Sequence, residues 1–121
     1  MTQAASQTPW QIEFYATSKS KSPAADFINE LPASERAKAS NVLRLLREFG
    51  TLLGLPHARP MSGRSKLREL RAGDVRLFYF AHTGRRFIVV HGFRKKSQKT
   101  PATEIATAER RMKQFLEEEE R

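Results

Sequence analysis

The chain has 121 residues, a formal net charge of +9 and no cysteine. This length suits one domain spanning residues 1–121, and a composition of 39% hydrophobic and 29% charged residues is typical of a folded globular protein. The lack of cysteine excludes disulfide bonds, thiolate catalysis and cysteine zinc sites. No apolar run approaches the roughly 18 residues of a membrane span.

The positive charge is concentrated in one third of the chain. Residues 59–99 contain twelve lysines and arginines but only two acids, Glu69 and Asp74, and therefore have a net charge of +10. The rest of the chain is nearly neutral. Charge gathered in this way is typical of a surface that binds a polyanion, which favours a nucleic-acid partner over a face that only keeps the protein soluble.

The N-terminal half predicts a strand and two helices. Residues 10–16 alternate and are rich in aromatic side chains, which indicates a strand. A short helix is predicted over residues 23–31, between two prolines. A second helix, with Ser34 as its N-cap, is predicted to run to about Phe49, and Gly50 suits its exit. Together these helices form a hairpin.

The second half predicts a loop, three strands and a helix. Residues 51–66 contain two glycines and two prolines, and we expect an extended loop there. Strands are predicted at residues 67–71, 75–81 and 87–93, and the short turns between them indicate an antiparallel meander. Apolar residues at helical spacing predict a last helix over residues 101–116.

The predicted order βααβββα defines an α+β fold. In it, an antiparallel-dominated sheet packs on the N-terminal helical hairpin, and the C-terminal helix covers part of the sheet. Residues 1–8 and 117–121 are expected to be loose. Residues 1–8 also lack the apolar centre of a secretory signal, so we expect a cytoplasmic protein with no membrane partner.

The residues available for chemistry are mainly cationic and aromatic. Only two aspartates occur, and the three histidines show no paired metal-ligand spacing, so we expect no metal and no cofactor. No Gly-rich phosphate loop and no GxSxG motif is present.

Alternation along the strands assigns side chains to faces of the sheet. The odd-numbered residues of 75–80 share one face, and the even-numbered ones, including Arg76, share the other. In residues 87–93 the odd-numbered side chains, including His91 and Phe93, are expected on one face. Arg76 is either a phosphate clamp or an edge cation paired with a surface carboxylate. Two further pairs of alternatives stay open, core packing or base stacking for Tyr79 and Phe93, and a structural role or proton transfer for His91.

Three segments carry a resemblance to a known family. Residues 67–71 (LRELR), 75–79 (VRLFY) and 91–101 (HGFRKKSQKTP) resemble the ELR, R-x-x-Y and HGF-x-KK-x-x-x-TP signature of the phage-derived, HigB-like branch of the RelE/ParE toxin superfamily. Glu104-Ile105 and Ala108 continue the signature. Each motif alone is weak, but their order and spacing are specific.

The resemblance implies a RelE-like sandwich and the function of a toxin in a type II toxin–antitoxin system. Such a toxin is a metal-independent endoribonuclease, or mRNA interferase, that cleaves messenger RNA in the ribosomal decoding site and so inhibits translation. Its implied partners are a cognate antitoxin, of helix-turn-helix type, and the ribosome with its mRNA.

The resemblance also suggests roles for individual residues. RNA is cleaved by its own 2′-hydroxyl when a proton acceptor, a proton donor and cations surround the phosphate. Arg71, Arg76 and Lys96 are the candidates for phosphate stabilisation, and Tyr79 and His91 for orientation or proton transfer. The candidates for RNA binding are Arg64, Lys66, Arg68, Phe93, Arg94, Lys95 and Lys99.

The proton acceptor is the point at which this sequence departs from the family. Related toxins often place a tyrosine or histidine near the C-terminus, whereas neither residue follows His91 here. Lys96 or Lys99, crowded by like charges, and a group of the ribosome are the alternatives.

The alternative function is a non-catalytic toxin or binding module, either a DNA gyrase inhibitor of ParE type or an RNA-binding protein. Cations on successive strands favour the nuclease, because a gyrase inhibitor needs no pocket centred on a phosphate.

Overall fold

The fold is built on one five-stranded sheet. A computed structural model describes residues 9–61 and 66–120, and the strands lie in the order β1-β5-β4-β3-β2 across the sheet. The strands are β1 (Gln11–Phe14), β2 (Ala58–Pro60), β3 (Arg68–Ala72), β4 (Val75–His82) and β5 (Arg86–Arg94). The helical elements are α1 (Pro23–Asn29), α2 (Ala33–Phe49), the 3-10 turn η2 (Gly50–Leu52) and α3 (Ala102–Glu119).

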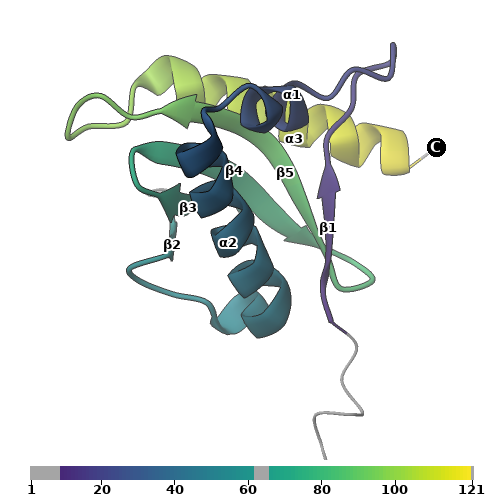
Figure 1. Cartoon of the computed structure of the whole chain (residues 1–121). Coiled ribbons are helices and arrows are strands. Elements are labelled where there is room, and N and C mark those ends of the chain that lie inside the picture. Colours follow the sequence, from purple (N-terminus) through teal and green to yellow (C-terminus); the bar gives the residue numbers. More distant parts are fainter. Residues whose placement is uncertain (1–8, 62–65, 121) are drawn as a thin grey trace, which may run out of the picture.

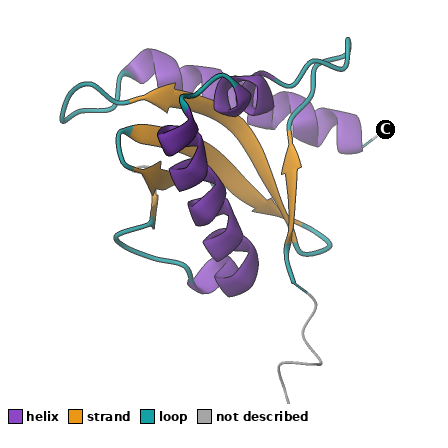
Figure 2. Cartoon of the chain, in the orientation of Figure 1, coloured by secondary structure: helices purple, strands orange, loops and turns teal. Residues whose placement is uncertain are grey.

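The helices lie on both faces of the sheet. Strand β1 runs parallel to β5, whereas all other neighbouring strands are antiparallel. Figure 1 shows α2 across one face with α3 behind the sheet, and Figure 2 distinguishes the strands from the helices that cover them. The predicted α+β fold, with its helical hairpin and antiparallel-dominated sheet, is confirmed. None of the described helices is long and apolar enough to cross a membrane.

Local sequence explains where the helical hairpin begins and ends. Pro23 opens α1, where its fixed φ suits the first helical turn and its missing N–H costs no hydrogen bond. Helix α2 begins at Ala33, two residues earlier than predicted, because Pro32 and not Ser34 is its N-cap residue. It ends at Gly50, which has a φ of +59° and leaves no room for a Cβ beside the indole of Trp10.

Strand β2 lies within the segment predicted to be a loop, so this part of the prediction was wrong. Its three residues pair antiparallel with β3, and Arg59 faces Glu69 in the register. Pro60, at its end, has no backbone N–H to donate, which an edge strand tolerates. The strand is too short and too rich in breakers for a periodic pattern to reveal it.

The sheet separates two apolar cores. Helices α1 and α2 cover one face, where Ile28, Val42 and Leu46 pack against Leu77 and Tyr79 of β4. Helix α3 covers the other face, where its apolar side chains pack against buried residues of β4 and β5. The helix contributes Ile105, Ala108, Met112, Phe115 and Leu116, and the strands contribute Phe78, Phe80, Ile88, Val90 and Phe93.

A β-bulge changes the face of the sheet to which the side chains of β5 point. Phe78 pairs with His91 and Tyr79 with Val89, which leaves Val90 as the extra residue between them. The expectation that all odd-numbered residues of 87–93 share a face is therefore wrong. Before the bulge, Val89 packs with α1 and α2, whereas after it His91 and Phe93 contact Phe78 on the α3 face.

The C-terminal helix is longer and better anchored than expected. We expected residues 117–121 to be loose, but α3 continues to Glu119. Glu119 accepts a 2.9 Å hydrogen bond from Arg86 and lies 3.4 Å from His82. These contacts tie the end of α3 to the hairpin of β4 and β5. Residues 1–8 and Arg121 lie outside the described part of the chain.

The glycine of the HGF motif is required by close packing. A Cβ built on Gly92 would lie 2.6 Å from Cδ2 of Phe27 in α1 and 3.0 Å from Cδ2 of Leu77 in β4. We predict that Gly92→Ala lowers the free energy of unfolding by about 1–3 kcal/mol, the usual cost of overpacking. Urea denaturation followed by circular dichroism measures this change.

Gly54→Ala is the matched control. No atom of residues 9–61 or 66–120 lies within 4 Å of a Cβ built on Gly54, apart from its chain neighbours, so this variant should stay within about 0.5 kcal/mol of wild type. Equal stabilities of the two variants would show that α1 does not press on β5 as described.

Candidate active site

A shallow, open pocket of about 530 Å³ lies where β2, β3 and β4 meet the loop after β5. Five of its lining residues are cationic, and a single acid, Asp74, accompanies them. The lining consists of Arg59, Arg71, Asp74, Arg76, Lys95, Lys96, Ser97 and Gln98. The predicted phosphate-stabilising residues Arg71, Arg76 and Lys96, with Lys95, are therefore together in one place.

The register of the sheet explains how residues far apart in the sequence converge here. Arg59 pairs with Glu69 across β2 and β3, and Arg71 pairs with Arg76 across β3 and β4. Glu69 and Arg71 are two residues apart on β3 and so share a face. Lys95 follows β5 directly, and its backbone N–H donates a 2.8 Å hydrogen bond to the carbonyl of Asp74.

A fully buried carboxylate holds three of the arginines. The side chain of Glu69 has 0% exposure. Its Oε1 accepts hydrogen bonds from Nε of Arg59 at 2.9 Å and from Nε of Arg71 at 3.2 Å. Its Oε2 lies 3.9 Å from Nε of Arg76. Because a buried charge without partners costs several kcal/mol, these arginines are what makes the burial of Glu69 tolerable.

The charged groups in this cluster shift one another's pKa. Burial alone would raise the pKa of Glu69, but hydrogen bonds from Arg59 and Arg71 and the charges of Arg59 and Arg76 outweigh it, so the pKa lies below its ordinary value. Burial lowers the pKa of Arg76, Arg71 and Arg59 lower it further, and Glu69 and Asp74 oppose the shift. An arginine keeps its charge through such a shift at neutral pH.

The hydrogen-bonding pattern leaves donors free for a ligand. Arg59 and Arg71 use only Nε toward Glu69, and their terminal nitrogens have no hydrogen-bond partner among the described residues. Arg76 directs Nη1 to the carbonyls of Gly73 and Val75. Free, fixed guanidinium nitrogens at an open pocket suit the oxygens of a phosphate group.

The position of Arg76 corrects one expectation. The structural alternative for this residue was an edge cation beside a surface carboxylate, but Glu69 is buried and the Arg76 side chain itself is only 14% exposed. Nε of Arg76 and Oε2 of Glu69 are buried without a hydrogen bond in the described part of the chain. Substitution of Arg76 therefore affects the core charge cluster as well as the pocket.

Two aromatic candidates are core residues instead of pocket residues. Tyr79 is 1% exposed, packs edge-on against Phe87, and lies on the face covered by α1 and α2, away from Arg76. Burial raises the pKa of its phenol, opposed by the hydrogen bond and charge of Arg68. Phe93 is 6% exposed and packs against Phe78. Neither ring is placed for base stacking, and Tyr79 does not line the pocket.

His91 lies beneath α3 rather than in the pocket. Its Nε2 is 2.6 Å from Oε1 of Glu104, and its Nδ1 is 3.1 Å from Nη1 of Arg111. Since arginine only donates, Nδ1 accepts, and Nε2 carries a proton that it donates to Glu104. Both ring nitrogens are occupied by α3, which favours the structural alternative for this histidine over proton transfer.

The remaining described residues predicted to bind RNA do not line the pocket. Arg68 donates from Nε to the Tyr79 hydroxyl at 3.2 Å, and Arg94 pairs with Glu35 of α2. Lys66 and Lys99 are exposed but do not line the pocket. Arg64 lies outside the described residues.

Sequence reasoning missed four lining residues, Arg59, Asp74, Ser97 and Gln98. Arg59 was counted in the basic segment but placed in a loop, and its role depends on the unpredicted strand β2. Asp74 was assigned to a turn, and the signal that distinguishes it is its position two residues before Arg76 in a segment with only two acids.

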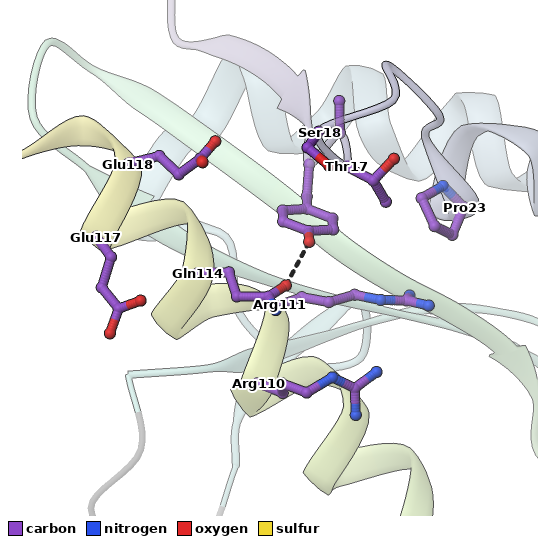
Figure 3. A pocket seen from close by; sticks show the side chains of 10 residues that line it. Thr17, Ser18, Pro23, Arg110, Arg111, Gln114, Glu117 and Glu118 are labelled. Atoms are coloured by element: carbon purple, nitrogen blue, oxygen red, sulfur yellow. Dashed lines mark hydrogen bonds between the residues drawn. The ribbon is translucent and has the colours of Figure 1, made fainter. Parts of the chain in front are cut away.

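A second hollow of about 460 Å³ lies between the loop after β1 and α3 (Figure 3). Tyr15 donates a hydrogen bond to Gln114 across it, and Arg110 and Arg111 are balanced by Glu117 and Glu118. It contains none of the predicted site residues and no excess positive charge. The basic pocket is therefore the candidate site.

We predict that Glu69→Gln lowers the free energy of unfolding at pH 7 by about 3–5 kcal/mol, because it leaves the arginine charges uncompensated. The folded-state pKa of Glu69 lies below the unfolded one, so its carboxylate contributes stability above about pH 4.5 and loses it as the pH falls further. The difference between wild type and variant should thus shrink below that pH. Urea denaturation at a series of pH values tests this.

Glu48→Gln provides the control, because Glu48 forms an exposed pair with Arg44 at 3.0 Å within α2. It should change stability by less than about 0.5 kcal/mol at every pH. A Glu69→Gln variant as stable as this control would contradict the described cluster.

Comparison with known proteins agrees with the architecture. A chain of the archaeal RelE–RelB complex from Pyrococcus horikoshii OT3 superimposes with a TM-score of 0.56 at 11% identity, covering 76% of this chain and 100% of that one. A chain of the toxin–antitoxin complex RelBE2 from Mycobacterium tuberculosis gives 0.54 at 16% identity, covering 73% and 100%. At these identities the likeness concerns the fold.

The sequence itself matches one family over most of its length. No curated protein matches the chain significantly. Residues 26–113 match the family described as phage derived protein Gp49-like (DUF891), a span that includes the pocket and the three motifs. The chain therefore belongs to the phage-derived Gp49-like family and has the fold of the RelE toxin superfamily, as its motifs predicted.

Proposed function

We propose that this protein is the toxin of a type II toxin–antitoxin system and cleaves messenger RNA on the ribosome without a metal ion. The observation that supports this most directly is the pocket that gathers Arg59, Arg71, Arg76, Lys95 and Lys96 around one open space. Its charge suits a phosphodiester group of a nucleic acid. Membership in the Gp49-like family and the RelE-like fold support the toxin assignment.

The pocket supplies what cleavage by the neighbouring 2′-hydroxyl requires. Attack on phosphorus adds negative charge to the non-bridging oxygens, and preorganised cations stabilise that charge. Arg71 and Arg76 are held by strands and by Glu69, so their guanidinium groups need little reorganisation. Lys95 and Lys96, on the following loop, add ammonium groups that can also supply a proton to the leaving oxygen.

The proposed dependence on the ribosome rests on the lack, among the described residues of the pocket, of groups that could recognise bases. Cations contact phosphates of any sequence, whereas base recognition requires contacts to base edges or stacking on exposed rings. The aromatic candidates Tyr79 and Phe93 are buried and offer no such platform. We therefore assign the positioning of the RNA strand to the ribosomal decoding site.

The proposed partner is a cognate antitoxin, of helix-turn-helix type. The two similar structures named above are, by their names, a RelE–RelB complex and the toxin–antitoxin complex RelBE2. An acidic segment laid over residues 59–99 would neutralise the pocket and block access of RNA.

Ribosome dependence is the test of this function. The purified protein should cleave a message positioned in the decoding site of programmed ribosomes and leave the same message intact when it is free. Primer extension measures both. Magnesium beyond the level that keeps ribosomes assembled should not raise the rate. Efficient cleavage of free RNA, or altered DNA supercoiling in place of cleavage, would disprove the proposal.

Lys96 gives a cleaner substitution than Arg76, because it is exposed and forms no hydrogen bond or ion pair with a described residue. Lys96→Ala should lower the single-turnover cleavage rate by about 10²-fold, the lower end for loss of one charge-stabilising donor. The free energy of unfolding of this variant should differ from that of wild type by less than about 0.5 kcal/mol. Lys113→Ala is the control, since Lys113 is exposed on α3 and lies outside the pocket lining. Equal rates for the two variants would remove Lys96 from the site.

A further inference from the structure

The pocket contains one carboxylate whose role is unexplained. Asp74 is exposed at the turn between β3 and β4 and lines the pocket with five cations. It is close enough to raise the pKa of Arg76 through its charge. Nevertheless its carboxylate forms no ion pair or hydrogen bond within the described part of the chain. A single acid left unpaired among so many cations is available for chemistry.

The other carboxylate near the pocket is not available. Glu69 is fully buried, and two arginines donate to its Oε1. A substrate hydroxyl cannot reach it without breaking the cluster. Tyr79 and His91, the neutral candidates for proton transfer, lie outside the pocket lining. Of the side chains that line the pocket, Asp74 is therefore the one that accepts a proton at neutral pH without first losing one.

Backbone hydrogen bonds fix the position of Asp74 relative to the lysines. The carbonyl of Asp74 accepts a 2.8 Å hydrogen bond from the N–H of Lys95. Val75, the next residue, pairs with Arg94 in the sheet. The turn that carries the carboxylate and the loop that carries Lys95 and Lys96 are thus fixed to one another, on two sides of the same pocket.

We propose that Asp74 is the proton acceptor of the cleavage reaction, an inference that rests on the proposed ribonuclease function. The 2′-hydroxyl gives its proton to the Asp74 carboxylate while its oxygen bonds to phosphorus. The bond from phosphorus to the 5′-oxygen breaks, and that oxygen keeps the electron pair and takes a proton from a lysine ammonium of the pocket. The products are a 2′,3′-cyclic phosphate and a 5′-hydroxyl, and solvent restores both side chains.

A purely structural role for Asp74 makes a different prediction. Aspartate is common in tight turns, where asparagine serves equally well because both side chains bond to nearby backbone groups. Asp74→Asn therefore preserves the turn and removes both the negative charge and the ability to accept a proton. Asp26→Asn is the matched control: it makes the same chemical change at the only other aspartate, which is exposed on α1 and outside the pocket.

The experiment measures cleavage and binding separately. Single-turnover cleavage is followed on programmed ribosomes, and affinity is measured with a message whose scissile nucleotide lacks its 2′-hydroxyl. Asp74→Asn should cleave about 10²- to 10⁴-fold more slowly, the range for loss of a general base. Its affinity should be unchanged or tighter, because a negative charge beside the phosphate has been removed. Asp74→Glu should recover part of the rate, and Asp26→Asn should match wild type.

A substrate with sulfur in place of the scissile 5′-oxygen distinguishes the two ends of the proton transfer, because a thiolate leaves without being protonated. Asp74→Asn should remain slow on this substrate. Recovery of the Asp74→Asn rate on this substrate would assign Asp74 to proton donation and overturn the inference. Cleavage of the normal message by Asp74→Asn at the wild-type rate would also overturn it. So would a loss of cleavage that is fully explained by a loss of binding. A wild-type protein that cleaves no message at all would instead disprove the proposed function.

Discussion

The burial of Glu69 among three arginines is the constraint on which the candidate site depends. A carboxylate with no exposure is tolerated only when cations satisfy it, and Arg59, Arg71 and Arg76 come from three adjacent strands to do so. The hydrogen bonds to Glu69 also orient Arg59 and Arg71, because they engage Nε and leave the terminal nitrogens without a partner among the described residues. The stability of this corner of the sheet and the charge of the site therefore have the same origin, and neither changes without the other.

The β-bulge divides the second face of the sheet into a region for packing and a region for binding. Because Val90 is an extra residue, His91 and Phe93 point to the face that carries Arg76 instead of the face of the helical hairpin. Helix α3 then covers His91 through Glu104 and Arg111, and its first turn starts only after the loop of Lys95 to Gln98. The arginine end of the sheet is left uncovered. The helix that completes the core thus also sets the boundary of the pocket.

Much of this arrangement was predictable from the sequence, and the failures have physical reasons. Alternation in β4 correctly put Arg76 opposite Leu77 and Tyr79, since a paired strand keeps its period of two. Alternation in β5 failed at Val90, because an inserted residue leaves no mark in a run of four buried apolar side chains. Strand β2 was missed because three residues ending in proline carry no period. Glu69 was taken for a surface group because the sequence does not show that three arginines converge on it.

The fold alone does not decide the chemistry, since similar structures share only 11% and 16% of their residues with this chain. What distinguishes the site is a pair of carboxylates in contrasting surroundings. Hydrogen bonds and charges outweigh the burial of Glu69, lower its pKa and keep it ionised, while the arginines surround it and remove it from contact with a ligand. Asp74 faces the same cations from the open side and remains unpaired among the described residues. Two acids at one basic pocket thus lie in contrasting places, one buried beneath it and holding the cations, the other facing its open space.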